Sequence, residues 1–253
     1  MPFITLLTDF GSSDSYVAEM KAALLSRVPE SVIIDISHEV PPGDRRGARY
    51  LLARSWHRFP MGTVHVAVVD PEVGTARRAL AAQAQGHSFI APDNGLLSPI
   101  LEGATVVELA VPPDASTTFH GRDVFAPAAA RLAKGEALDA LGQPVEDPVF
   151  TPLPVPQQDA GGVRGEVVYV DRFGTLISNI PAAAFAGSTG VVVGGEFTAL
   201  PGRTFRDVPR GALVAFVGSG GTVEIAARDR SAAQATGVGM GGEVRVLGTS
   251  LRD

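Results

Sequence analysis

The first half of the chain alternates short apolar runs with segments whose apolar residues recur every three or four positions. The apolar runs predict three buried strands, at residues 3–8, 32–36 and 64–69. The helical period predicts helices at residues 15–28, with Asp14 as the expected N-cap, and at residues 48–56. Strands and helices in this repeating order are typical of a mostly parallel sheet flanked by helices.

Shorter elements follow in the same style. They are predicted strands at residues 78–83, 88–91 and 105–111 and predicted helices at residues 96–101 and 123–134. His120 and Gly121 come directly before the last helix. The pattern up to this point therefore predicts the α/β fold class.

The composition changes after residue 150. Prolines cluster there, and two glutamines and a glycine pair follow, as is typical of a semi-rigid linker. Beyond the linker, apolar strands separated by glycine-rich turns predict a small antiparallel β-barrel. We therefore expect an N-terminal α/β domain at residues 1–150, a proline-rich linker at 151–162 and a C-terminal β-barrel domain at 163–253.

Composition narrows the class of protein. The 253 residues are 45 % hydrophobic and carry a net charge of −6, so no basic surface for nucleic acid or an acidic membrane is expected. The chain contains no cysteine, which excludes disulfides and thiolate nucleophiles. The opening MPFITLLTDF lacks a basic region and reaches an acid at Asp9, unlike a signal peptide or a membrane span. We therefore expect a cytoplasmic protein.

Common cofactor motifs do not fit. Residues 237–242 match G-x-G-x-x-G, but they follow no predicted strand and open no predicted helix, so they predict a flexible loop. The P-loop pattern G-x-x-x-x-G-K-[ST] and the nucleophile elbow G-x-S-x-G do not occur in the sequence. The five histidines show no metal-binding spacing, and we expect neither a metal ion nor a cofactor.

Candidate chemistry comes from the strand ends. Asp9, Asp70 and Asp93 each follow a predicted strand, and His120 lies at a helix entrance. Arg77 follows Asp70 by seven residues, across a glycine turn. Each acid alone is better explained as a turn or capping residue. Because ligands gather where parallel strands end, the set together favours an active site at one rim of the sheet.

Seven segments carry a resemblance to a known family. They are LLTDFGSSDSYVAEMK, SHEVPP, VVDPEVGTARR, APDNGLL, TFHGRDVFAPAAARLA, VDRFGTLISNI and GSGGTVEIA. In this order they resemble the S-adenosyl-L-methionine (SAM) hydroxide adenosyltransferases, adenosine-forming SAM hydrolases related to the fluorinases and chlorinases. The resemblance implies an α/β domain, a C-terminal barrel and a homotrimer that binds its substrate between subunits.

The resemblance also implies functional residues. It assigns the catalytic triad to Asp70, Arg77 and His120. It implies substrate contacts at Asp9, Asp14, Asp171, Phe173, Thr175, Phe205, Ser219, Glu224 and Ala227. Asp9 would hold the ribose hydroxyls and Ser219 the methionine carboxylate, whereas Asp14 can equally be a helix cap and Phe173 a core residue.

Two departures from the family pattern affect the substrate contacts. Thr175 replaces an asparagine that touches adenine in relatives, which weakens one expected contact with the base. Gly218 and Gly220 flank Ser219 where relatives often carry bulkier or more polar residues, so the methionine end is expected to be looser.

The implied reaction is attack of water on C5′ of the ribose, with adenosine and L-methionine as products. The sulfonium departs as a neutral thioether, so positioning the water is the main difficulty. Arg77 would make Asp70 a weaker base, which favours orientation of water over proton abstraction and leaves both open. The alternatives are a halogenase, disfavoured because Asp70 would repel a halide, and a non-catalytic adenosine- or SAM-binding protein.

Overall fold

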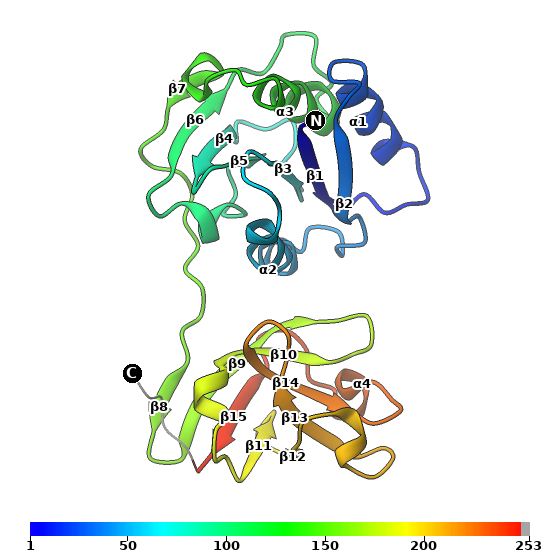
Figure 1. The fold of residues 1–253 in the computed structure, drawn as a ribbon, viewed down its shortest axis with the longest axis vertical. Coiled ribbons are helices and arrows are strands. Elements are labelled where there is room, and N and C mark those ends of the chain that lie inside the picture. Colours follow the sequence, from blue (N-terminus) through cyan, green and yellow to red (C-terminus); the bar gives the residue numbers. More distant parts are fainter. Residues whose placement is uncertain (249–253) are drawn as a thin grey trace. The chain divides into compact units, whose positions relative to one another are not determined.

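The computed structural model describes residues 1–248, which divide into two units, Met1–Pro152 and the residues from Leu153 onward (Figure 1). The predicted α/β fold with a C-terminal barrel is confirmed. The longest helix within residues 1–248 has 11 residues, too few to cross a membrane.

The first unit is built on a seven-stranded sheet with the order β2-β1-β3-β5-β4-β6-β7. Its strands are β1 (Phe3–Thr8), β2 (Val32–Ser37), β3 (Val64–Val68), β4 (Ala79–Ala84), β5 (His87–Pro92), β6 (Thr105–Leu109) and β7 (Gly142–Pro144). The pairings from β2 to β5 are parallel, so the carboxyl ends of β1, β3 and β5 meet at one rim.

The other half of this sheet is antiparallel, which differs from the mostly parallel sheet that the sequence predicts. The reversal begins at the two-residue loop between β4 and β5, where Gln85 and Gly86 both have positive φ. A two-residue turn of this kind can only join antiparallel strands. Because β4 runs antiparallel to β5, the start of β4 and Arg77, which precedes it, lie at the same rim as the carboxyl end of β5.

Side chains alternate along the strands and feed two separate cores. Ile4 and Leu6 of β1 pack with Met20 of α1 (Tyr16–Leu25) and with α3 (Ala126–Ala133) on one face of the sheet. Leu7 packs with Leu52 of α2 (Arg45–Ser55) on the opposite face. Figure 1 shows α1 and α3 on one side of the sheet and α2 on the other. Successive side chains of a strand point to opposite faces, so an apolar run such as residues 3–8 supplies both cores.

The helix boundaries differ from the predictions, and α2 begins at Arg45 where residue 48 was expected. Helix α1 begins at Tyr16 after the N-cap Ser15, so the prediction that Asp14 caps it is wrong. The helix expected at 123–134 begins as a π-helical turn, η3 (Gly121–Phe125), before α3. The helix expected at 96–101 is the short 3₁₀ turn η2 (Ser98–Ile100). The other 3₁₀ turns are η1 (Trp56–Arg58), η4 (Leu138–Ala140), η5 (Ala182–Phe185) and η6 (Phe205–Asp207).

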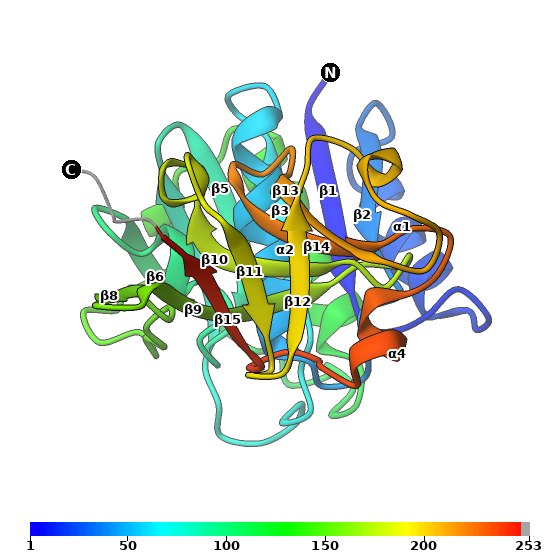
Figure 2. The ribbon, with the colours of Figure 1, turned by 90° about the horizontal axis from the view of Figure 1, so that it is seen from below.

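The second unit is a mixed β-barrel closed by pairing of β10 with β9 (Figure 2). Its strands are β8 (Gln157–Asp159), β9 (Gly162–Val170), β10 (Leu176–Pro181), β11 (Gly190–Val193), β12 (Phe197–Pro201), β13 (Leu213–Val217), β14 (Thr222–Ala227) and β15 (Glu243–Leu247). Strand β8, within the segment expected to be linker, adds to the edge of β9. The barrel pairings are antiparallel except for β12 with β13.

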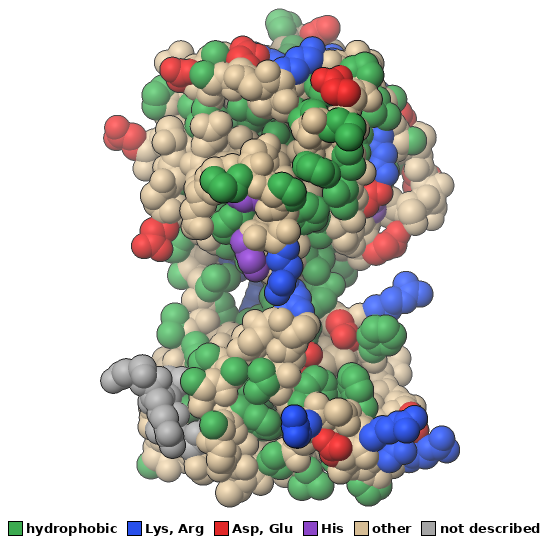
Figure 3. All heavy atoms as spheres, viewed as in Figure 1, with side chains coloured by type: hydrophobic (Ala, Val, Ile, Leu, Met, Phe, Trp, Pro, Cys, Tyr) green, Lys and Arg blue, Asp and Glu red, His purple; other side chains and the backbone are tan. Residues whose placement is uncertain are grey.

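The glycine pattern at 237–242 behaves as a loop. It follows the short helix α4 (Ala232–Thr236), which ends at Gly237 in the left-handed conformation, and it leads into β15. The surface agrees with the modest negative charge. On the face shown in Figure 3, the basic side chains of the described residues are scattered among acidic and apolar ones.

Candidate active site

The structure brings Asp70, Arg77 and His120 together at the carboxyl rim of the parallel strands. Arg77 Nε donates to Asp70 Oδ2 over 2.9 Å, and Arg77 Nη2 donates to the same oxygen. Arg77 Nη2 also lies 2.9 Å from His120 Nδ1. The side chains of Asp70 and Arg77 are only 4 % and 5 % exposed, so this ion pair is shielded from water. The three residues therefore form one connected polar cluster.

The arginine fixes the proton on His120. A guanidinium has only donors, so Nδ1 must accept and the ring proton lies on Nε2. Burial and then the positive charge of Arg77 lower the pKa of His120 below its ordinary value of 6.5. The ring is therefore neutral at physiological pH and offers an N–H donor at Nε2.

Asp70 keeps one oxygen free of protein donors. Oδ2 receives Arg77, whereas Oδ1 is buried and has no hydrogen-bond partner among the described residues. Such an atom is costly unless a water or a ligand satisfies it. Asp70 and His120 both line a cavity of about 230 Å³ in the first unit. A water molecule in this cavity could therefore donate a hydrogen bond to Asp70 Oδ1.

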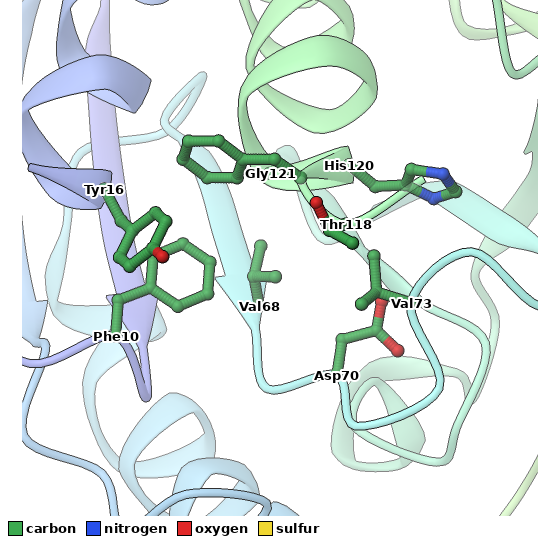
Figure 4. Close-up of a pocket in the computed structure, with 9 residues that line it drawn as sticks. Phe10, Tyr16, Val68, Asp70, Val73, Thr118, His120 and Gly121 are labelled. Carbon is green, nitrogen blue, oxygen red and sulfur yellow. The ribbon is translucent and has the colours of Figure 1, made fainter. Parts of the chain in front are cut away.

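An aromatic group forms the opposite wall of the cavity. Figure 4 shows Phe10 and Tyr16 on one side, with Asp70, Val73 and His120 on the other. Phe10, Tyr16 and Phe119 meet edge to face, with ring centroids 5.3–6.1 Å apart. The sequence analysis missed these rings, although Phe10 and Phe119 directly adjoin the candidate residues Asp9 and His120.

Asp9 lies at the end of β1, on the same rim as Asp70. Its Oδ2 accepts the backbone N–H of Gly43 at 2.8 Å. Burial raises the pKa of Asp9, and the negative charge of Asp70 raises it further. The two acids therefore interact across the end of the sheet, as the parallel topology predicts.

The third strand-end acid does not join this cluster. Asp93 receives Arg78 Nε at 2.7 Å and the backbone N–H of Val149 at 2.7 Å, and it does not line the cavity. Asp93 therefore lies outside the Asp70–Arg77–His120 cluster. Asp14 is exposed in the loop before α1 and also lies outside the cavity lining.

The predicted substrate contacts of the barrel occupy the β9–β10 turn and the region of β13 and β14. Asp171 Oδ1 accepts the N–H groups of Phe173 and Thr175, so this carboxylate shapes its own turn. Phe173 is 80 % exposed, which excludes a core role, and Thr175 is buried. Phe205 is half exposed and packs edge to face on Phe216, with centroids 5.2 Å apart.

Ser219 lies in the exposed turn between β13 and β14, and Glu224 and Ala227 are buried in β14. Gly218 lies close to Glu224. A Cβ at residue 218 would lie 1.8 Å from Glu224 Oε1, so a larger residue there would require the Glu224 side chain to move.

A second buried histidine cluster lies in the first unit, away from the cavity lining. His65 Nδ1 bonds Thr5 Oγ1 at 2.8 Å, and His65 Nε2 bonds His87 Nδ1 at 3.1 Å. Phe59, Phe89 and Trp56 surround the two imidazoles. Within residues 1–248, no three histidine, aspartate or glutamate side chains are grouped to hold a metal ion.

Comparison with known proteins identifies the family. A family model described as the SAM hydroxide adenosyltransferase N-terminal domain matches residues 4–142, and the C-terminal domain model matches residues 165–245. The chain belongs to the SAM hydroxide adenosyltransferase family.

Relatives of the family cover nearly the whole chain. An (R)-S-adenosyl-L-methionine hydrolase of Thermus thermophilus is 42 % identical and covers 96 % of this chain and 99 % of its own. A fluorinase of Actinoplanes is 31 % identical and covers 71 % of this chain and 72 % of its own. A crystal structure of an uncharacterized conserved protein from Thermotoga maritima superposes with a TM-score of 0.89 at 36 % identity, over 96 % of this chain and 99 % of that one.

Proposed function

We propose that this protein hydrolyses SAM to adenosine and L-methionine. The observation that carries the proposal is the Asp70–Arg77–His120 cluster, in which one buried carboxylate oxygen faces no protein donor. Membership of a family whose relatives include a protein named as an (R)-SAM hydrolase supports the same substrate.

The reaction is a displacement at C5′ of the ribose. The oxygen of water forms a bond to C5′ while the C5′–S bond breaks, and its electron pair stays on sulfur. The sulfonium thereby becomes the neutral thioether of methionine, so the leaving group needs no proton. One proton leaves the attacking water. The protein's main task is to hold that water in line with the C5′–S bond, and such positioning is worth several kcal/mol.

Each member of the cluster has a distinct task. Asp70 Oδ1 accepts a hydrogen bond from the water and thereby aims its lone pair away from the carboxylate. The Nε2–H of neutral His120 donates a hydrogen bond to the oxygen of the attacking water and fixes its position. Arg77 balances the charge of Asp70 and keeps His120 in the required tautomer. In this arrangement Asp70 primarily orients the water, and it can receive the proton afterwards.

Asp9 is proposed to hold the ribose hydroxyls, because its carboxylate lies on the same rim as Asp70 and its two oxygens have more acceptor capacity than the Gly43 N–H uses. For the barrel, the exposure of Phe173 and Phe205 supports a role in stacking on adenine. Ser219, in an exposed turn, is proposed to meet the methionine carboxylate. We further propose a homotrimer that acts in the cytoplasm.

The test incubates the purified protein with each sulfonium epimer of SAM in H₂¹⁸O. We expect equimolar adenosine and methionine, with ¹⁸O in the 5′-hydroxyl of adenosine. Because the relatives are named for the (R) epimer, this epimer is expected to react faster. Adenosine that lacks the label, or no adenosine from either epimer, would reject the proposal.

Two controls separate the alternatives. Formation of 5′-chloro-5′-deoxyadenosine in chloride buffer would indicate a halogenase. Tight adenosine binding without turnover, unchanged in Asp70→Ala, would indicate a binding protein.

A further inference from the structure

The turn that follows β5, residues 92–95, bonds to the chain next to Asp70 and next to Arg77. Asp93 and Asn94 are each 7 % exposed, and Gly95 completes the turn with φ of +85°. Because β5 lies between β3 and β4 in the sheet, this turn has Asp70, which follows β3, on one side and Arg77, which precedes β4, on the other. It is the structural neighbour that the two share.

Asn94 holds the chain at Asp70. Its Nδ2 donates to the carbonyl oxygen of Val69 over 2.9 Å, in a buried position. That carbonyl belongs to the peptide bond that leads into Asp70. Because Asp70 follows the end of β3 and is outside the ladder, this side-chain bond replaces the strand pairing that would otherwise fix the peptide.

Asp93 holds the chain at Arg77. Its Oδ2 receives Arg78 Nε at 2.7 Å, and its backbone N–H donates to the Arg78 carbonyl at 2.9 Å. Arg78 is thus clamped by side chain and backbone together. Successive side chains of an extended segment point in opposite directions, so fixing Arg78 towards Asp93 directs Arg77 towards Asp70.

We propose that Asp93 and Asn94 are positioning residues of the site, Asn94 for the carboxylate of Asp70 and Asp93 for the guanidinium of Arg77. The inference rests on the proposed hydrolysis for its kinetic readout only. Neither residue lines the cavity, so each acts through the residue it holds. The 92–95 turn is therefore a template that sets the spacing between the two charged groups.

Asp147 provides a matched control for Asp93. Arg78 Nη1 donates to Asp147 Oδ1 at 2.7 Å, so both acids bind the same arginine over the same distance. The side chain of Asp147 is 85 % exposed, whereas that of Asp93 is 3 % exposed. Exposed ion pairs contribute little, so losing this one should leave Arg78 in place.

The experiment compares Asp93→Asn, Asn94→Ala and Asp147→Asn with the wild-type protein. We expect kcat to fall about 10-fold or more in the first two, with KM within about threefold, and to stay unchanged in Asp147→Asn. Truncating a positioning residue misplaces the reacting groups and leaves substrate affinity largely intact, whereas a general loss of structure would change both constants.

A second readout needs no substrate. The imidazole ¹⁵N shifts of His120, assigned by comparison with His120→Asn, report the titration of the ring, whose charged neighbours are Arg77, Asp70 and Asp123. In Asp93→Asn, Arg77 withdraws from Nδ1, so the pKa of His120 should rise towards 6.5. In Asn94→Ala the contact of Arg77 with His120 persists, and the titration should match the wild type.

The outcomes are distinct. If Asp93→Asn matches Asp147→Asn in both kcat and the His120 titration, the template is rejected. If Asp93→Asn does not fold, Arg78→Lys is used in its place. Lysine retains the charge but cannot contact both acids and the backbone of residue 147 at once. An unchanged His120 titration in Arg78→Lys rejects the role of Asp93. If the wild type forms no adenosine, the proposed function fails, and the titration alone decides the role of Asp93.

Discussion

Two buried histidine clusters lie at opposite ends of the same parallel strands. His120, Arg77 and Asp70 meet beyond the carboxyl end of β3, and His65 and His87 lie at the amino ends of β3 and β5. Burial lowers the pKa of His120 and of His65, and the pKa of His65 falls to about 3. Both imidazoles are therefore neutral, although their surroundings differ.

The difference lies in what each cluster leaves unsatisfied. Both ring nitrogens of His65 have partners in the protein, Thr5 on one side and His87 on the other, and aromatic rings close the space around them. At the other end, Arg77 occupies Nδ1 of His120 and Oδ2 of Asp70, while Asp70 Oδ1 is left over beside a cavity. A buried histidine cluster is therefore a candidate site when one of its polar atoms has no partner within the protein and lies beside a cavity.

The largest effect is expected from removing the unsatisfied oxygen. Asp70→Asn keeps the shape of the side chain but replaces the charge and presents an amide to the water. We expect the rate of adenosine formation to fall on the order of 10²- to 10³-fold, as for loss of one preorganised polar group. The rate is measured by chromatography, with Asp139→Asn, an exposed acid of η4, as the control. A loss of less than about threefold would contradict the role of Asp70.

The closed cluster should respond in stability instead. His65→Asn removes a ring packed against Phe59 and Phe89 and leaves His87 short of a partner. We expect the free energy of unfolding to fall by about 2–4 kcal/mol, while kcat of the folded protein is unchanged. Urea denaturation measures the first quantity. His57→Asn, which alters an exposed ring, should change neither; a large kcat effect in His65→Asn would show that the clusters are coupled.

His120→Asn should give the opposite result to His65→Asn. We expect kcat to fall about 10- to 100-fold, because the donor at Nε2 is lost while Asp70 and Arg77 still pair. The free energy of unfolding should fall by less in His120→Asn than in His65→Asn, because the His120 site already contains an unsatisfied atom, Asp70 Oδ1. Equal losses of stability in the two variants would remove the contrast between the two ends of the sheet.

The smallest effect is a pH dependence of stability. The folded pKa of His65 is lowered to about 3 from 6.5, so the unfolded state binds more protons below pH 6.5. The stability contributed by neutral His65 is therefore present above pH 6.5 and is lost as the pH falls towards 3. By linkage it should decrease by about 2 kcal/mol between neutral pH and pH 5. Urea denaturation of the wild type and of His65→Asn at both pH values measures this loss. If the free energy of unfolding falls equally in the two proteins between neutral pH and pH 5, the prediction is contradicted.

Much of the site could be predicted from the sequence because strand ends are local signals. Asp9 and Asp70 follow apolar runs, and parallel pairing then places them on one rim. The same reasoning wrongly added Asp93, since topology places the backbone but does not say where the side chain points. Its direction depends on Arg78 and on Val149, which is 56 residues away in the chain.

Some other features depended on contacts between distant segments, and one had a local signal that the prediction overlooked. The aromatic wall requires rings from the loop after β1, from α1 and from the segment before η3 to meet. The antiparallel half of the sheet had a local signal, the Gln85–Gly86 pair, which lies between two apolar runs at hairpin spacing. Ser15 displaced Asp14 as the N-cap because the loop after Gly11 runs one residue further than the pattern suggests.

The π-helical turn of η3 gives the spacing after His120 a meaning of its own. Such a turn contains one residue more than regular helix geometry needs, and Arg77 packs over the ring of Phe125 at its end, 5.4 Å from the centroid. Deleting a single amino acid between His120 and α3 would remove the extra residue of this turn, so His120 would have to take a new position relative to Arg77. The number of residues between His120 and α3 therefore matters to the site as much as their identity does. A homologue that lacks one of these residues is expected to be inactive.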